Sequence, residues 1–204
     1  MEVKMVIFDL DGVLVDACEW HYVALNEALD EIANYKISYA EHIKTFNGIP
    51  TRKKLKKLTE LGYIRQEDHK KINNLKQEKT IQIIDKYATV SREKIELLSF
   101  LKKREIKVAC YTNSIRKTAN MMLERTGIVD FFDLILTNQD VCEPKPSPEG
   151  YLNIIEHFSI DKKNTIIVED SPKGLEAAIN SGCFVVKVKN PAEVNVKMIR
   201  EFIS

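Results

Sequence analysis

The sequence is poor in the features that mark membrane, nucleic-acid-binding and low-complexity proteins. No apolar run approaches the roughly 18 residues that a membrane-spanning helix needs. Basic and acidic residues nearly cancel, 31 against 30, so the chain as a whole has no electrostatic reason to bind nucleic acid or an anionic membrane. With 7 glycines and 6 prolines in 204 residues, it contains no low-complexity tract. The composition therefore predicts a globular chain with one core, or one core and a small lid.

Disulfide and metal-finger patterns are also missing. No CxxC pair and no histidine cluster accompanies the four cysteines, which are Cys18, Cys110, Cys142 and Cys183. Cys110 and Cys183 lie in or beside apolar runs, which is typical of buried free thiols. The first apolar run, residues 5–8, is too short for a signal peptide and is followed at once by Asp9. We therefore expect a reduced protein of the cytoplasm.

Strand and helix patterns alternate through most of the chain. Apolar, β-branched runs predict strands at 3–10, 106–112, 132–137, 165–168 and 183–188. Helical periodicity predicts helices at 18–34, 115–126, 148–158, 172–180 and 192–203. Because the strands are apolar throughout and alternate with helices, we expect an α/β fold. Its core is a Rossmann-like parallel sheet covered by helices on both faces.

Strand signals disappear between about residues 36 and 88. From Lys44 to Lys76 the sequence has ten lysines and arginines against three acidic residues, in charged helical patterns. This composition shift predicts a small helical domain inserted after the first strand. We place the α/β core domain at 1–16 and 90–204, and the helical domain at 17–89.

Polar residues close four of the predicted strands. They are Asp9 and Asp11, then Thr112, Asn113 and Ser114, then Lys145 in a longer loop, and finally Glu169 and Asp170. In an open parallel sheet, ligands bind outside the carboxyl ends of the strands. We therefore expect these side chains to form one site.

This set of residue types suits phosphoryl transfer. A carboxylate such as Asp9 can attack phosphorus and form an aspartyl-phosphate, and Asp11, two residues later, can exchange a proton with the leaving oxygen. Lys145 can neutralise phosphate charge, and the Thr112 hydroxyl with the N–H groups that follow it can bond phosphoryl oxygens.

A carboxylate that approaches a phosphate dianion is repelled unless a cation lies between them. Asp9, Glu169 and Asp170 offer the oxygen ligands that Mg²⁺ prefers. The sequence therefore predicts a bound Mg²⁺ and a small phosphorylated metabolite as substrate.

Four motifs in this order resemble those of the haloacid dehalogenase superfamily. They are residues 8–16 around Asp9 and Asp11, residues 112–114, Lys145 between two prolines, and residues 168–178 around Glu169 and Asp170. Their order and spacing match over essentially the whole chain. The resemblance implies a magnesium-dependent hydrolase in which the backbone carbonyl of Asp11 is a further metal ligand. Because dehalogenases of the superfamily lack the second aspartate, the presence of Asp11 points to phosphate esters.

The helical insertion resembles the cap domain of the phosphoglycolate phosphatase and β-phosphoglucomutase branch. The resemblance implies substrate contacts for Arg52, Lys76 and His21, to which we add Arg116 beside the second motif. One extra residue separates Gly48 from Arg52, and Ala17 stands where the mutase has a hydroxyl residue. Both departures favour a phosphatase over a mutase.

Three functions stay open, in decreasing order of support. The first is hydrolysis of a small phosphate monoester, such as a sugar, polyol or amino-alcohol phosphate. The second is a β-phosphoglucomutase-like sugar phosphomutase, and the third a catalytically silent binding protein of the same fold. The basic segment lacks the interleaved aromatics of nucleic-acid-binding segments, and we expect a monomer with no membrane partner.

Overall fold

A computed structural model describes residues 2–203, which divide into two compact units. The first holds the described residues up to Asp16 together with those from Thr89 onward, and the second is Ala17–Ala88. Their roles as catalytic core and cap stay predictions. None of the helices in the described part of the chain is long and apolar enough to span a membrane.

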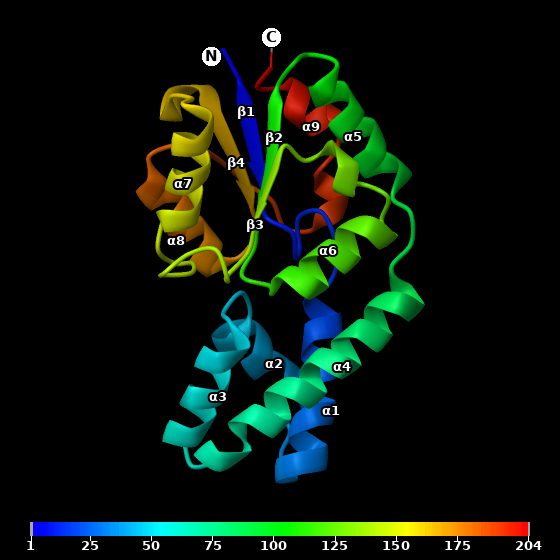
Figure 1. Ribbon diagram of the computed structural model, residues 1–204, viewed down its shortest axis with the longest axis vertical. Helices are drawn as coiled ribbons and strands as arrows, with labels where there is room; N and C mark the ends of the chain where they lie inside the picture. Colours follow the sequence, from blue (N-terminus) through cyan, green and yellow to red (C-terminus); the bar gives the residue numbers. More distant parts are fainter. Residues whose placement is uncertain (1, 204) are drawn as a thin grey trace. The chain divides into compact units, whose positions relative to one another are not determined.

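The first unit is built on a five-stranded parallel sheet in the order β3-β2-β1-β4-β5 (Figure 1). Its strands are β1 (Met5–Phe8), β2 (Lys107–Tyr111), β3 (Leu134–Leu136), β4 (Thr165–Glu169) and β5 (Phe184–Lys187). All four residues of the central β1 are buried, as are all five of β4. Strands buried on both faces need continuous apolar runs, and this requirement explains the sequence pattern. The parallel α/β fold is confirmed.

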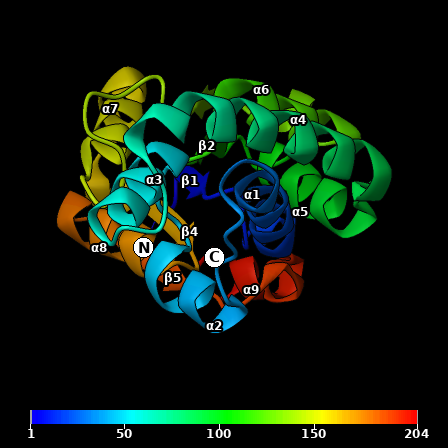
Figure 2. The same ribbon diagram turned by 90° about the horizontal axis from the view of Figure 1, so that it is seen from below.

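Helices cover both faces of this sheet, as Figures 1 and 2 show. One face carries α7 (Glu149–Phe158) and α8 (Pro172–Ser181), and the other carries α5 (Arg92–Lys102), α6 (Arg116–Arg125) and α9 (Val196–Arg200). Single 3₁₀ turns lie at Val129–Phe131, Lys162–Asn164 and Pro191–Glu193.

The last helix is much shorter than predicted. Residues 192–203 were expected to be helical, but only Val196–Arg200 is α-helix. The Asn195 side chain accepts a hydrogen bond from the Met198 N–H and so caps a new helix at that point. Asn190 caps the preceding 3₁₀ turn in the same way, so two polar caps divide the segment.

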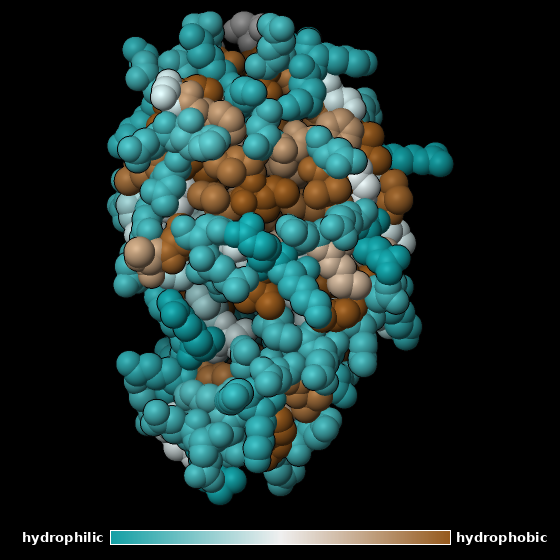
Figure 3. Space-filling view, in the orientation of Figure 1, coloured by the Kyte–Doolittle hydropathy of each residue, from teal (hydrophilic) through white to brown (hydrophobic). Residues whose placement is uncertain are grey.

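One hydrophobic cluster of this unit lies between the sheet and helices α7 and α8. Its buried residues include Met5, Ile7, Ala109, Tyr111, Tyr151 and Ile167. Figure 3 shows a hydrophobic band on this unit near the β3 edge, where Leu134 and Leu136 are half-buried.

No disulfide joins the four cysteines. Cys110 is buried as predicted, whereas Cys183 is only half-buried.

The second unit, Ala17–Ala88, is entirely helical. It contains α1 (Cys18–Ala33), α2 (Tyr39–Glu41), a π-helical turn (His42–Phe46), α3 (Thr51–Glu60), a 3₁₀ turn (Gln66–Asp68) and α4 (His69–Tyr87). Helices α1 and α4 pack along each other, and an apolar core that includes Leu25, Leu29, Phe46 and Leu58 fills the unit. The Asn26 side chain bonds both backbone groups of Ile37, which fixes the segment after α1.

Candidate functional site

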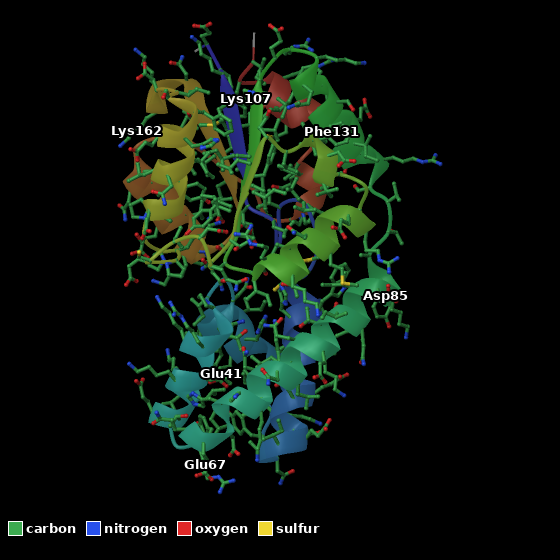
Figure 4. All side chains as sticks on the ribbon, in the orientation of Figure 1. Glu41, Glu67, Asp85, Lys107, Phe131 and Lys162 are labelled. Carbon is green, nitrogen blue, oxygen red and sulfur yellow. The ribbon has the colours of Figure 1, made fainter. Side chains whose placement is uncertain are left out.

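The predicted polar residues of the first unit meet at the carboxyl end of the sheet. Asp9 directly follows β1, and its N–H bonds the Val168 carbonyl of β4 at 3.0 Å. Glu169 is the last residue of β4, and Asp170 follows it. Lys107, labelled in Figure 4, begins β2 and so marks the opposite end of the sheet. The parallel register thus brings together residues 160 positions apart in the sequence.

Three carboxylates and one ammonium form the centre of this site. Oxygen atoms of Asp9, Glu169 and Asp170 lie within 4.8 Å of one another. Lys145 is 2% exposed, and its Nζ contacts Asp9 Oδ1 at 2.5 Å and Glu169 Oε1. A single buried ammonium therefore balances three carboxylates, and the centre attracts further positive charge.

Burial controls the protonation of Asp9. Desolvation raises the pKa of Asp9 well above its ordinary value, Lys145 opposes the rise, and Glu169 and Asp170 add to it. A protonated Asp9 would be a poor nucleophile. A cation bound beside it would favour its charged form.

Asp170 is the carboxylate best suited to hold such a cation. Its Oδ1 is buried and has no hydrogen-bond partner within residues 2–203. Desolvation and then the charge of Glu169 raise the pKa of Asp170 to about 7. Gly12, at a φ of +89°, leaves the space that Asp170 occupies, because a Cβ there would collide with its carboxylate. An unsatisfied buried oxygen beside two other carboxylates fits a divalent, oxygen-loving ion such as Mg²⁺.

Glu169 is in a different state, because protein donors already occupy both of its oxygens. Its Oε1 accepts from Lys145 and from the Tyr151 hydroxyl at 3.0 Å. Its Oε2 accepts from the N–H groups of Asp170 and Ser171 at 3.0 and 3.1 Å, and from the Ser171 hydroxyl at 3.3 Å. Each carboxylate oxygen offers about two lone-pair sites. In this arrangement Glu169 therefore anchors Lys145, and its role as a metal ligand stays a prediction.

Asp11 is oriented by the second motif. Its Oδ2 accepts hydrogen bonds from the Thr112 hydroxyl at 3.0 Å and the Ser114 hydroxyl at 2.9 Å. The sequence predicted substrate contacts for the Thr112 hydroxyl and for the N–H groups that follow it, and these stay predictions. In the structure the Thr112 and Ser114 hydroxyls orient a carboxylate that could exchange a proton. The role of the Asp11 carbonyl as a metal ligand stays a prediction.

Asn113 and Arg116 also make contacts that the sequence did not predict. The Asn113 side chain bonds the Lys145 carbonyl at 3.3 Å and the Lys145 N–H at 3.2 Å, so it fixes the backbone that carries the buried ammonium. Arg116 is paired with Asp140 on the surface. Their predicted substrate contacts stay untested.

The helical unit has a charged cluster of its own. Lys76 is buried, and its Nζ lies 3.2 Å from His21 Nδ1, so two of the predicted residues meet. Arg52 is exposed, whereas Lys54, two residues later, is buried.

His42 is a member of this cluster that sequence reasoning missed. It is 1% exposed, and burial, followed by the charges of Lys54 and His21, lowers its pKa to about 4. The sequence gave one weak indication that Lys54 is buried, because Lys54 lies on the same face of α3 as the apolar Leu58. No sequence pattern marked His42.

Comparisons with known proteins agree with this geometry. The sequence profile described as "Haloacid dehalogenase-like hydrolase" matches residues 6–188. The "Phosphorylated carbohydrates phosphatase" of Thermotoga maritima is 30% identical over 182 residues, which are 88% of this chain and 82% of that protein. The "Pyrophosphatase PpaX" of Bacillus velezensis is 28% identical over 188 residues, 88% of this chain and 80% of that protein.

Solved structures give the same fold. The crystal structure of the β-phosphoglucomutase of Clostridium difficile superposes with a TM-score of 0.83 at 24% identity, and the match covers 98% of this chain and 96% of that one. The parallel sheet, the order of the four motifs and the match over residues 6–188 therefore agree. This chain belongs to the haloacid dehalogenase-like hydrolases.

Proposed function

We propose that this protein is a magnesium-dependent phosphatase that hydrolyses a small phosphate monoester through an aspartyl-phosphate on Asp9. The observation that carries the proposal is the arrangement around Asp9. A buried ammonium contacts one of its oxygens, and nearby lies an oxygen of the Asp170 carboxylate that has no hydrogen-bond partner among the described residues. A nucleophile, a charge neutraliser and room for a cation are the parts that phosphoryl transfer needs.

In the first step an Asp9 oxygen attacks phosphorus. The bond from phosphorus to the ester oxygen breaks, and the leaving alkoxide takes a proton from Asp11. Thr112 and Ser114 hold the Asp11 carboxyl group by its Oδ2, so its orientation is set before the substrate binds. Lys145 stabilises the negative charge near Asp9.

In the second step water attacks the same phosphorus. Asp11, now a carboxylate, removes a proton from the water, and the bond between phosphorus and the Asp9 oxygen breaks. Inorganic phosphate leaves, Asp9 is again a carboxylate, and Asp11 is protonated for the next cycle. Both steps balance without an oxidant or reductant.

Mg²⁺ would be held by Asp9 and Asp170, with Glu169 beside them and the Asp11 carbonyl as the further predicted ligand. When bound, the ion shields the phosphate dianion from the attacking carboxylate. The three carboxylate oxygens within 4.8 Å support this assignment.

The substrate class is inferred from the helical unit and from the relatives. One relative is named for phosphorylated carbohydrates and another for pyrophosphate. We infer that Lys76 and His21, which lie together, bind the part of the substrate that is not transferred. Such a pair favours a polar or anionic group, such as a sugar, a polyol or a second phosphate.

The test is release of inorganic phosphate from a panel of sugar, polyol and amino-alcohol phosphates, phosphoglycolate and pyrophosphate, with Mg²⁺ and with EDTA. We expect release from a few related compounds in Mg²⁺ and none in EDTA. Conversion of a hexose phosphate into an isomer without phosphate release would instead establish a mutase. Binding of these compounds without turnover would establish a silent binding protein.

A further inference from the structure

Two tyrosines enclose the buried Lys145 ammonium, and neither has a part in the mechanism described so far. Lys145 Nζ lies 4.9 Å from the ring centroid of Tyr111 and 5.1 Å from that of Tyr151. The two rings meet edge to face, with centroids 5.0 Å apart and planes at 89°. Both residues are fully buried. Cation–π attraction acts within about 6 Å, so both rings stabilise the charged ammonium.

The chain leaves space for this enclosure with two glycines. A Cβ at Gly150 would overlap the Tyr111 ring, and a Cβ at Gly174 would overlap the Glu169 carboxylate. Gly150 immediately precedes Tyr151 in α7, so one short segment supplies both the space for the first ring and the second ring itself. Larger side chains at these two positions would displace the groups that surround Lys145.

The hydroxyl groups of the two tyrosines differ in their surroundings. Tyr151 donates to Glu169 Oε1 at 3.0 Å, the same oxygen that Lys145 contacts. The Tyr111 hydroxyl has no hydrogen-bond partner in the described part of the chain. Both rings lie at similar distances from the ammonium, but only the Tyr151 hydroxyl donates to a carboxylate of the charged centre.

We propose that Tyr151 is a positioning residue. Its hydroxyl keeps Glu169 turned toward Lys145, and Glu169 in turn holds the ammonium against Asp9. This role rests on the proposed phosphatase activity. An ammonium has three N–H donors, and two of those of Lys145 are directed to Asp9 and Glu169. Without the Tyr151 hydroxyl, Glu169 Oε1 keeps Lys145 as its one donor instead of two. The Asp170 and Ser171 groups still hold Oε2, so Oε1 can turn about this anchored oxygen and lengthen its contact with Lys145.

The experiment compares Tyr151→Phe with Tyr111→Phe. Each variant removes one buried hydroxyl and keeps the ring, so they are matched in volume and in cation–π contact. We expect Tyr151→Phe to lower kcat about ten-fold and to change KM by less than about two-fold, because the hydroxyl acts on the reacting centre and not on substrate binding. Tyr111→Phe should lower kcat much less than Tyr151→Phe, because the Tyr111 hydroxyl donates to neither Asp9 nor Glu169.

A second readout does not depend on activity. In protein labelled with ¹⁵N-lysine, the Lys145 ammonium signal is assigned by its loss in Lys145→Arg. Lys94 is also buried, and it donates to the Glu93 carboxylate and to the carbonyls of Pro191 and Val194, a set of partners that it does not share with Lys145, so its signal is the internal reference. Tyr151→Phe should shift the Lys145 signal and speed its hydrogen exchange. The Lys94 signal should not change in either variant, and Tyr111→Phe should change the Lys145 signal less than Tyr151→Phe.

The two readouts separate this proposal from the proposed function. If the unchanged protein releases no phosphate from any compound, the phosphatase proposal fails, and the ammonium signal still tests whether Tyr151 positions Lys145. Equal kcat values and equal Lys145 signals in the two tyrosine variants would overturn the role of Tyr151. A loss of thermal stability in Tyr151→Phe with kcat, KM and the Lys145 signal unchanged would reduce Tyr151 to a purely structural residue.

Discussion

The two units bury ionisable groups of opposite kinds. In the α/β unit, three carboxylates surround one ammonium, and burial raises the pKa values of Asp9 and Asp170. In the helical unit, lysines and histidines lie together, and burial lowers the pKa of His42 to about 4. The first arrangement favours the binding of a cation, and the second favours an anionic or polar group. This contrast matches the two components of the proposed reaction, a metal ion and a phosphorylated metabolite.

The contrast also gives the units opposite responses to pH. The folded-state pKa of Asp170 is raised, so its contribution to stability is fully present below about 4 and is lost as pH rises through about 7. The folded-state pKa of His42 is lowered, so its contribution is present above about 6.5 and is lost as pH falls toward 4. Each half of the comparison can be tested separately.

The largest effect should come from the nucleophile. We expect Asp9→Asn to lower phosphate release more than about 1000-fold, because the amide cannot form the acyl phosphate. Phosphate release in saturating Mg²⁺ measures the loss, and a circular dichroism spectrum like that of the unchanged protein shows that the fold is kept. Substantial remaining activity would remove Asp9 as the nucleophile.

Mg²⁺ should remove the response of the carboxylates to pH. Without metal, the contribution of Asp170 to the free energy of unfolding, taken as the difference between the unchanged protein and Asp170→Asn, should fall by about 2–3 kcal/mol between pH 5 and pH 8, because Asp170 must ionise beside Glu169. Saturating Mg²⁺ should reverse most of this fall, and Asp170→Asn should make the metal-free protein less sensitive to pH. Urea unfolding at both pH values measures the change. Equal stabilisation by Mg²⁺ at pH 5 and pH 8 would contradict the carboxylate assignment.

The helical unit should respond in the opposite direction. The contribution of His42 to the free energy of unfolding, taken as the difference between the unchanged protein and His42→Gln, should fall by about 2 kcal/mol between pH 7.5 and pH 5, because His42 takes up a proton on unfolding. His42→Gln should flatten this part of the profile. His157, which lies near the end of α7 in the other unit, is the matched control. If His157→Gln flattened the profile as much as His42→Gln, the assignment to His42 would be wrong.

The smallest effect should distinguish the buried Lys76 of the helical unit from the exposed Arg52. We expect Lys76→Met to raise KM about ten-fold and to change kcat less, because the lysine binds the part of the substrate that is not transferred. Arg52→Met should change KM by about two-fold at most, since Arg52 is exposed. Steady-state kinetics with the best substrate of the panel measures both. A larger effect for Arg52 would restore it as the main substrate contact.

Much of the α/β unit was predictable from the sequence because its candidate site residues lie at the ends of strands. Apolar runs located the strands, and the parallel sheet then required Asp9, Thr112 and Glu169 to meet. The contacts of Tyr151 and His42 were not predictable in this way. Tyr151 lies on the buried face of α7 with Ile154 and Ile155, a pattern that indicates burial but not the partner of a hydroxyl.

The contacts that each polar residue makes also depended on the tertiary structure. Thr112 and Asn113 were predicted to bind substrate, yet they hold Asp11 and the Lys145 backbone across 101 and 32 sequence positions. The choice among several acceptors is made by side-chain orientation, which spacing does not specify. The same reason explains why the sequence singled out Arg52 and missed the buried Lys54.

The most direct measurement is to trap the phosphoenzyme. The protein is mixed with its best substrate in Mg²⁺, quenched in acid within the first turnover and digested, and the peptides are analysed by mass spectrometry. We expect one added phosphoryl group on the peptide that contains Asp9, and none in Asp9→Asn. A phosphoryl group on another residue, or rapid phosphate release with no labelled peptide at any quench time, would show that Asp9 is not the nucleophile.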